Sequence, residues 1–172
     1  RDAAAMERRL REHRIEAVWH GAAITANLER EKTQALAILE VNLLASVATL
    51  EAAARAGVRR FVYPSSSSVY GATAHEAGGP MDEDVRLQPF NLYGISKMAT
   101  EKAVLHLARE RGLPACAGRI NAVFGPWERD TGLRDTLSPL LQLAAFARES
   151  REAVLARDGV RDWVYAPDVA DA

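Results

Sequence analysis

The sequence predicts an α/β protein with a doubly wound, mostly parallel sheet. Short apolar runs that suit buried strands alternate with longer segments whose apolar residues recur at helical spacing. No internal repeat interrupts this alternation, which is typical of strands joined by crossover helices. Two of the strand candidates lead into small or hydroxyl residues, namely Gly21-Ala22-Ala23 and Ser65 to Ser68. Open sheets of this class bind ligands at the carboxyl ends of their strands, so both segments are candidate ligand contacts.

The order of the elements follows from the same patterns. Each expected strand is a short apolar run, and each expected helix is a longer periodic one that ends near a glycine or a polar segment. The segment 72–89 contains glycine, proline and an acidic run, and is expected to be a loop. Helices are expected at residues 3–13, 33–55, 93–111 and 137–149, and strands at 17–20, 60–64, 113–120, 153–155 and 163–165.

The composition excludes several classes of protein. With 172 residues, of which 48% are hydrophobic, the chain is long enough for one domain with a substantial core. Lysine and arginine number 22 against 23 aspartate and glutamate residues, so no basic surplus predicts a nucleic acid or an anionic membrane as partner. The apolar stretch 35–54 is interrupted by Glu40, Asn42 and Glu51, which favours a buried helix over a membrane span.

The single cysteine, Cys116, lies in the apolar run from Leu113 to Ala117. A buried core thiol is therefore favoured over a nucleophile or a metal ligand, and no metal site is expected. One cysteine also excludes a disulfide framework, which fits a reducing cytoplasm as the location of the protein.

Tyr93 and Lys97 are the strongest candidates for catalytic chemistry. They stand four residues apart at the start of the expected helix 93–111, so both lie on one face of that helix. An ammonium beside a phenol favours the phenolate, which is what a hydroxyl general acid or base needs. For this spacing on its own, the alternative is a surface tyrosine that stands beside a solvated lysine by chance.

The segment after strand 17–20 is a second candidate contact. Its small residues Gly21, Ala22 and Ala23 let a ligand approach the backbone closely. The alternative is a tight turn between strand and helix with nothing bound. His20, at the end of the strand, is on its own more typical of a hydrogen-bonded core histidine than of a catalytic group.

Five stretches in this order resemble the extended short-chain dehydrogenase/reductase family, the sugar epimerases and dehydratases with a Rossmann core. Each stretch alone is a weak signal, whereas the ordered set is specific and spans residues 18–165. The five stretches are Val18 to Ala23, Phe61 to Gly71, Tyr93 to Lys97, Arg119 to Pro126 and Arg161 to Tyr165.

The resemblance implies a role for each matched residue. Tyr93 is expected to be the acid/base, Lys97 to bind the nicotinamide ribose, and Ser66 to hydrogen-bond the reacting oxygen. These roles are chemically coherent, because deprotonating a carbinol makes hydride loss to a nicotinamide feasible. Arg161 is expected to face the diphosphate part of a sugar nucleotide, with an ordinary salt bridge as the alternative. The other contacts are expected from His20, Ala22, Ala23 and Ser65, with Tyr93 and Lys97, to NAD or NADP, and from Ser67, Tyr70 and Asn121 to the substrate.

Three departures limit the resemblance. The glycine-rich turn that binds a pyrophosphate does not occur, nor does the residue that separates NAD from NADP, so the chain is expected to begin after that half of the fold. Dehydratases of the family carry an Asp-Glu pair where Ser67-Ser68 stand, which disfavours elimination of water. Many of its epimerases carry Asn where Ala122 stands. We therefore expect a fold truncated at both ends, with residues 1–126 as the C-terminal part of a dinucleotide-binding core and 127–172 as the start of a substrate-binding region.

The expected function is NAD(P)-dependent epimerisation or dehydrogenation of a sugar, a sugar nucleotide or a sugar-derived carbinol. Both reactions start with the same tyrosine-assisted hydride abstraction. The alternative is a non-catalytic or truncated Rossmann-like binding or regulatory protein, which the missing glycine turn motivates. Helices 33–55 and 93–111 are apolar nearly all round, so we expect them to pair with their copies in a homodimer.

Overall fold

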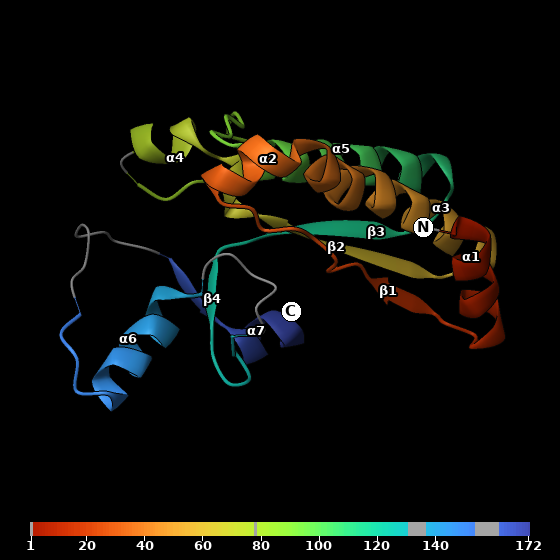
Figure 1. The fold of residues 1–172 in the computed structure, drawn as a ribbon. Coiled ribbons are helices and arrows are strands. Elements are labelled where there is room, and N and C mark those ends of the chain that lie inside the picture. The colour runs from red at the N-terminus through yellow and green to blue at the C-terminus, as the bar shows by residue number, and fades with distance from the viewer. Residues whose placement is uncertain (1, 78, 131–136, 154–161) are drawn as a thin grey trace. The chain divides into compact units, whose positions relative to one another are not determined.

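The computed structural model describes residues 2–77, 79–130, 137–153 and 162–172. The chain divides into two compact units, Arg1–Arg119 and Ile120–Ala172. Both units contain parallel strands with helices beside them, which confirms the predicted α/β class (Figure 1). The division falls a few residues before the predicted boundary at 126, and the roles assigned to residues 1–126 and 127–172 stay predictions.

The first unit is a three-stranded sheet with helices on one face (Figure 1). β1 (Ala17–Trp19) pairs in parallel with β2 (Arg60–Ser66), so that Val18 stands opposite Phe61. β3 (Ala115–Ile120) lies on the other side of β2. Leu50, Phe61 and Val104 are fully buried in the core between sheet and helices. The main helices of this unit are α1 (Ala3–Glu12), α2 (Leu28–Leu39), α3 (Ala45–Ala56) and α5 (Leu92–Glu110).

One long helical segment, from Leu28 to Ala56, stands where helix 33–55 was predicted. A short helix precedes the predicted start, because the side chain of Asn27 accepts a hydrogen bond from the backbone N–H of Arg30 (2.8 Å) and caps its first turn. The backbone at Gln34 is not helical (φ −132°, ψ 29°), so the segment is kinked there, next to the predicted start at residue 33. A π-helical turn, η1 (Glu40–Leu44), separates α2 from α3. The segment ends at Gly57, whose φ of 78° is left-handed and suits a helix stop.

By length and composition the same segment could cross a membrane, since its most apolar stretch has a mean hydropathy of 1.6. In the structure its inner face packs in the core of the first unit, where Ile38 and Leu50 are fully buried. A core helix of a folded domain has the same length and composition. Only 28% of the apolar stretch is buried, however, so its outer face is left uncovered by the described residues. The absence of a membrane partner therefore stays a prediction.

One local prediction is wrong in part, and one strand was not predicted. A short helix, α4 (Ala72–Glu76), occupies the start of the predicted loop 72–89. It forms because Gly71 turns the chain with a φ of 50° and the N–H of Ala72 donates to the carbonyl of Gln88 (2.9 Å). The strand that was not predicted is β4 (Ala122–Phe124). Both elements are too short for a periodic pattern to reveal them.

The predicted burial of Cys116 is wrong as well, because its thiol is exposed. Side chains alternate along β3, and Ala115 and Ala117 face the core, so Cys116 points to the opposite face of the sheet. Trp19 of β1 is 56% exposed on that same face. In the described part of the first unit the helices cover the other face, so an apolar run does not imply burial on both sides.

The second unit contains two parallel strands, β4 and β5 (Trp163–Tyr165), with Val123 opposite Val164. Its main helix, α6 (Pro139–Arg148), is capped by Ser138, whose hydroxyl donates to Glu128 (2.6 Å) and accepts from the N–H of Leu141 (3.1 Å). A short helix, α7 (Ala166–Asp171), follows β5. Most of the predicted strand 153–155 and the turn Asp158-Gly159 lie outside the described residues.

Candidate active site

The first turn of α5 carries Tyr93, and several contacts hold it in place. Asn91 caps the helix by accepting from the N–H of Gly94 (2.8 Å). The N–H of Tyr93 itself donates to the carboxylate of Glu31 on α2 (3.2 Å). Gly94 lies so close to the segment after β2 that a Cβ added to it would stand 2.7 Å from the carbonyl oxygen of Ser68. The start of α5 therefore lies directly against the segment that follows β2.

Ser66 is the last residue of β2 and caps the short 3₁₀ helix η2 (Ser67–Val69). Its hydroxyl accepts from the N–H of Ser68 (3.2 Å) and donates to the Ser68 hydroxyl (3.0 Å). A pocket of about 240 Å³ beside η2 and the start of α5 is lined by Ser67, Ser68 and Asn91, among others. The pocket thus lies beside residues that are close in sequence to Ser66 and Tyr93. The catalytic roles of the Ser66 and Tyr93 hydroxyls stay predictions.

Lys97 lies one helical turn after Tyr93 and is only 4% exposed. Its ammonium donates to the backbone carbonyl of Pro64 and lies 4.4 Å from the centre of the Tyr63 ring. Burial lowers the pKa of Lys97 from 10.5 to about 8, while the nearby charge of Glu101 acts in the opposite direction. The lowered pKa brings the titration of the amine closer to neutral pH. Two consecutive residues of β2, Tyr63 and Pro64, contact its nitrogen.

Glu101, one turn further along α5, joins α5 to β2 and β3. Its carboxylate accepts from the hydroxyl of Ser65 (2.7 Å) and from the guanidinium of Arg119 (2.7 Å). Arg119 also donates to the phenol oxygen of Tyr70 (3.2 Å) and to the backbone carbonyl of Glu83 (2.8 Å). Because the carboxylate and the guanidinium are nearly buried, this ion pair needs all of these hydrogen bonds. It fixes the end of β2 next to the helix that carries Tyr93 and Lys97.

Asn42, in the π-helical turn, joins three further elements. Its side chain accepts from the N–H of Ile24 (2.7 Å) and donates to the Ile24 carbonyl (3.1 Å) and the Ser96 hydroxyl (3.0 Å). Its backbone carbonyl accepts from Ser46 and Thr100. The buried side-chain amide of Asn42 thus connects the loop after β1 to α5. Single π-helical turns are often found at functional sites.

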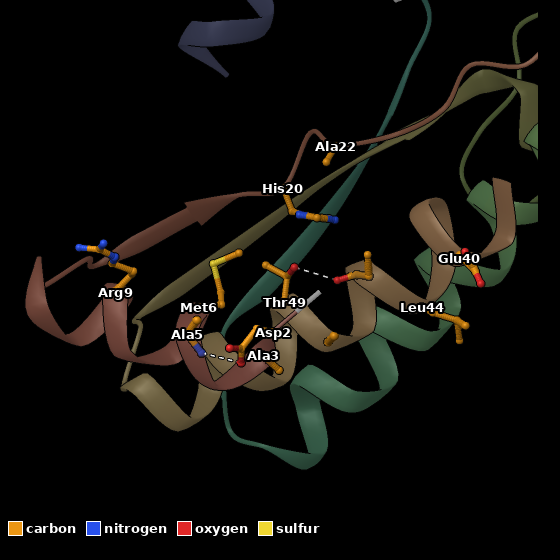
Figure 2. A pocket seen from close by; sticks show the side chains of 12 residues that line it. Asp2, Ala3, Ala5, Met6, Arg9, His20, Ala22, Glu40, Leu44 and Thr49 are labelled. Carbon is orange, nitrogen blue, oxygen red and sulfur yellow. Dashed lines mark hydrogen bonds between the residues drawn. The ribbon is translucent and has the colours of Figure 1, made fainter. Parts of the chain in front are cut away.

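His20 ends β1 and is mostly buried, with Nε2 2.9 Å from the hydroxyl of Ser46. Burial and, to a lesser degree, the charge of Lys97 lower the pKa of His20, which favours the neutral ring. It also lines a largely apolar pocket of about 780 Å³ with Ala22, Met6 and Thr49, shown in Figure 2. Ala22 and Ala23 are exposed, so their backbone is open to a ligand.

The remaining predicted contacts are distributed over the chain. The hydroxyl of Ser65 donates to the carboxylate of Glu101. The guanidinium carbon of Arg119 lies over the ring of Tyr70, 5.1 Å from the ring centre. Asn121 belongs to the second unit, where its side chain donates to Asp162 (3.1 Å). Arg161 lies outside the described residues. No group of three or more potential metal ligands occurs in the ranges that the structure describes.

Sequence reasoning missed Glu31, Tyr63 and Glu101. Glu101 had a usable signal, because it stands at i+4 from Lys97 and therefore on the same helix face. Tyr63 also had one, since the alternation along β2 puts it on the same side as Ser65. For Glu31 the sequence has no such signal, because its contact with α5 joins residues 62 positions apart.

One protein family matches the whole length of the chain. The sequence profile described as "NAD dependent epimerase/dehydratase family" matches residues 1–172. The chain belongs to this family. The resemblance to extended short-chain dehydrogenases/reductases is therefore confirmed, together with the Rossmann-type fold class.

Individual relatives are similar over nearly the whole chain. UDP-glucose 4-epimerase of Azospirillum brasilense is 30% identical over 182 residues, which cover 99% of this chain and 51% of that protein. The structure of UDP-glucose 4-epimerase from Thermotoga maritima with UDP-glucose matches with a TM-score of 0.80 at 28% identity, covering 99% of this chain and 54% of that one. A double mutant of the dTDP-glucose 4,6-dehydratase DesIV from Streptomyces venezuelae, with NAD bound, matches with a TM-score of 0.77 at 27% identity, covering 99% and 50%. The chain thus spans about half the length of these relatives.

Proposed function

We propose that this chain carries the proton-transfer residues of an NAD-dependent enzyme that acts on a sugar nucleotide, with epimerisation as its reaction. Tyr93 is the acid/base, Lys97 supports it, and Ser66 orients the reacting oxygen. The observation that carries the proposal is the buried ammonium of Lys97, held on β2 one turn after Tyr93. A lysine that serves only as a surface charge gains nothing from burial, which disfavours its charged form.

The residues present fit an NAD cofactor. The exposed backbone at Ala22 and Ala23 has only methyl groups beside it, which leaves room for a planar group to approach. The ammonium of Lys97 has three N–H donors, one of which is taken by Pro64, so donors remain for ribose hydroxyls. His20 is hydrogen-bonded to Ser46, and its lowered pKa favours the uncharged ring. When bound, NAD supplies a hydride acceptor that can also return the hydride.

The chain's own residues handle the proton of the substrate hydroxyl. Tyr93 takes this proton during oxidation and returns it during reduction, and the Ser66 hydroxyl fixes the oxygen between them. Ser67 and Ser68 stand where an acid pair for dehydration is expected in the family, so no carboxylic acid is present there to expel water. Epimerisation is therefore favoured over 4,6-dehydration, although relatives of both kinds match the chain.

The proposal is tested with the full-length protein and a panel of UDP- and dTDP-sugars. Epimerisation inverts one carbon without net change in NADH, whereas a dehydrogenase accumulates NADH, so product NMR and absorbance at the NADH band separate the two. Tyr93→Phe should lower turnover by about 10² to 10⁴-fold. His106→Gln, on the exposed side of the same helix, should leave turnover unchanged. Near-normal turnover of Tyr93→Phe, or binding without turnover in the parent protein, would contradict the proposal; the second result supports a non-catalytic binding protein.

We further infer a homodimer through the outer faces of the segment 28–56 and of α5. Leu36 and Leu44 are 71% and 60% exposed on the first, and Ile95 and Leu105 are 43% and 39% exposed on the second. Large apolar side chains on two adjacent helices form a surface that a second copy can cover in a four-helix arrangement. Sedimentation analysis of Leu36→Ser/Leu44→Ser should show a shift toward monomer, while Met6→Ser, at an exposed site on α1, should not.

A further inference from the structure

We propose that Tyr63 is a positioning residue for Lys97: its aromatic ring and the Pro64 carbonyl together hold the ammonium at a fixed place one helical turn from Tyr93. The two groups come from consecutive residues of β2, so strand geometry sets their spacing. The proposal rests on the proposed function only for the role of Lys97 itself.

The geometry suits a cation–π contact. Tyr63 is 1% exposed on the inner face of β2, so its ring has one fixed orientation in the core. The nitrogen of Lys97 stands 4.4 Å from the ring centre, within the range where the ring face attracts a cation. Burial disfavours the charged amine, and an aromatic face compensates for lost water without adding a second ionised group.

The hydroxyl of Tyr63 does not explain why a tyrosine stands here. Its oxygen is buried and has no hydrogen-bond partner within the described residues. Burial raises the pKa of Tyr63, and neighbouring Thr100 acts slightly against this. The single proton of the Thr100 hydroxyl is shared between the carbonyls of Asn42 and Ser96, so Thr100 is not a donor to the phenol oxygen. The ring, rather than the hydroxyl, is therefore the part of Tyr63 that acts on Lys97.

The charged and titratable groups around Lys97 do not replace the contact between its ammonium and the Tyr63 ring. Glu101 on α5 attracts the ammonium, but its carboxylate is already engaged by Arg119 of β3 and by Ser65. Burial and, to a lesser degree, the Lys97 charge lower the pKa of His20, at the end of β1. Tyr93 is on the same helix as Lys97. Among the described residues, the contacts that remain directly on the ammonium are the Pro64 carbonyl and the Tyr63 ring.

The test measures the pKa of Lys97 in the full-length protein by NMR of lysine labelled with ¹³C at Cε, without added dinucleotide. The Lys97 signal is assigned by its loss in Lys97→Arg. Tyr63→Phe keeps the ring, and its Lys97 pKa should stay within about 0.2 unit of the parent value. Tyr63→Leu removes the ring, and its Lys97 pKa should fall by roughly half a unit or more. Tyr63→Met is the second ring-free variant if the leucine variant does not fold.

Phe61→Leu is the matched control, because Phe61 is an equally buried ring two residues earlier on the same face of β2. It should reduce stability as Tyr63→Leu does but leave the Lys97 pKa unchanged. An unchanged Lys97 pKa in both ring-free variants would overturn the proposal, and so would an equal fall in Tyr63→Phe, which would assign the effect to the hydroxyl. Because this readout is independent of turnover, absence of activity on every nucleotide sugar would remove the proposed function and leave this result standing.

Discussion

The two halves of the inner face of α5 bury different chemistry. The first half buries a series of polar side chains, and the second half buries only apolar ones, which pack beside Leu50 and Phe61. Burying polar groups opposes folding unless each is hydrogen-bonded, whereas burying apolar ones supports it. The buried polar residues are Ser96, Lys97, Thr100 and Glu101, and the buried apolar residues are Val104 and Ala108.

This difference separates the part of the helix that builds a site from the part that builds the core. Each buried polar group of the first half has a partner on another element or on its own helix: Lys97 on β2, Glu101 on β2 and β3, and Ser96 on the π-helical turn. The second half needs no such partners. Substitutions in the first half should therefore affect function together with stability, and those in the second half stability alone.

The largest effect is expected for Glu101→Leu, which leaves the nearly buried guanidinium of Arg119 without its carboxylate. Breaking a buried ion pair from one side costs about 3 kcal/mol of unfolding free energy. Turnover should fall as well, because Ser65 loses its partner next to Ser66. Urea unfolding and the epimerase assay measure the two effects.

Two variants control this prediction. Glu101→Leu/Arg119→Met replaces both charges and should regain most of the stability without regaining turnover. Val104→Ala, in the second half of the face, should cost about 2 kcal/mol and leave kcat unchanged. Equal losses of kcat in Val104→Ala and Glu101→Leu would show that the two halves do not differ as proposed.

A smaller, pH-dependent effect is expected for Lys97→Met. The pKa of Lys97 is depressed from 10.5 to about 8, so between these values the unfolded chain holds a proton that the folded chain has released. The parent protein should therefore gain roughly 2 kcal/mol of stability between pH 7.5 and 10, and Lys97→Met should lack this gain. Urea unfolding of both proteins at the two pH values measures it; parallel pH curves would refute the depressed pKa.

The smallest effect on stability is expected for Gly94→Ala. Alanine favours a helix over glycine, but its Cβ would meet the Ser68 carbonyl at 2.7 Å, so α5 must move away from η2. The two effects partly cancel, leaving a loss of about 1 kcal/mol, whereas displacement of Tyr93 from Ser66 should lower kcat by about tenfold. Gly79→Ala, which has open space around it, should change neither quantity.

Local patterns in the sequence determined the parallel α/β class, the helix that begins near Tyr93, and the position of Ser66 at a strand end. Apolar residues recur at short, regular spacing within each helix and strand, so the sequence of a single segment is enough to predict its type. The same patterns were misleading for Cys116, because an apolar run records hydrophobicity and not which face of a sheet is covered.

The tertiary structure alone decided how the chemistry is held. The contacts of Lys97 with Pro64, of Asn42 with Ser96 and of Glu31 with Tyr93 join residues 33, 54 and 62 positions apart. No local spacing encodes such pairs, because they depend on how strands and helices pack once the core has formed. The sequence thus determined which groups could act, and packing determined which buried partners set their charge and position.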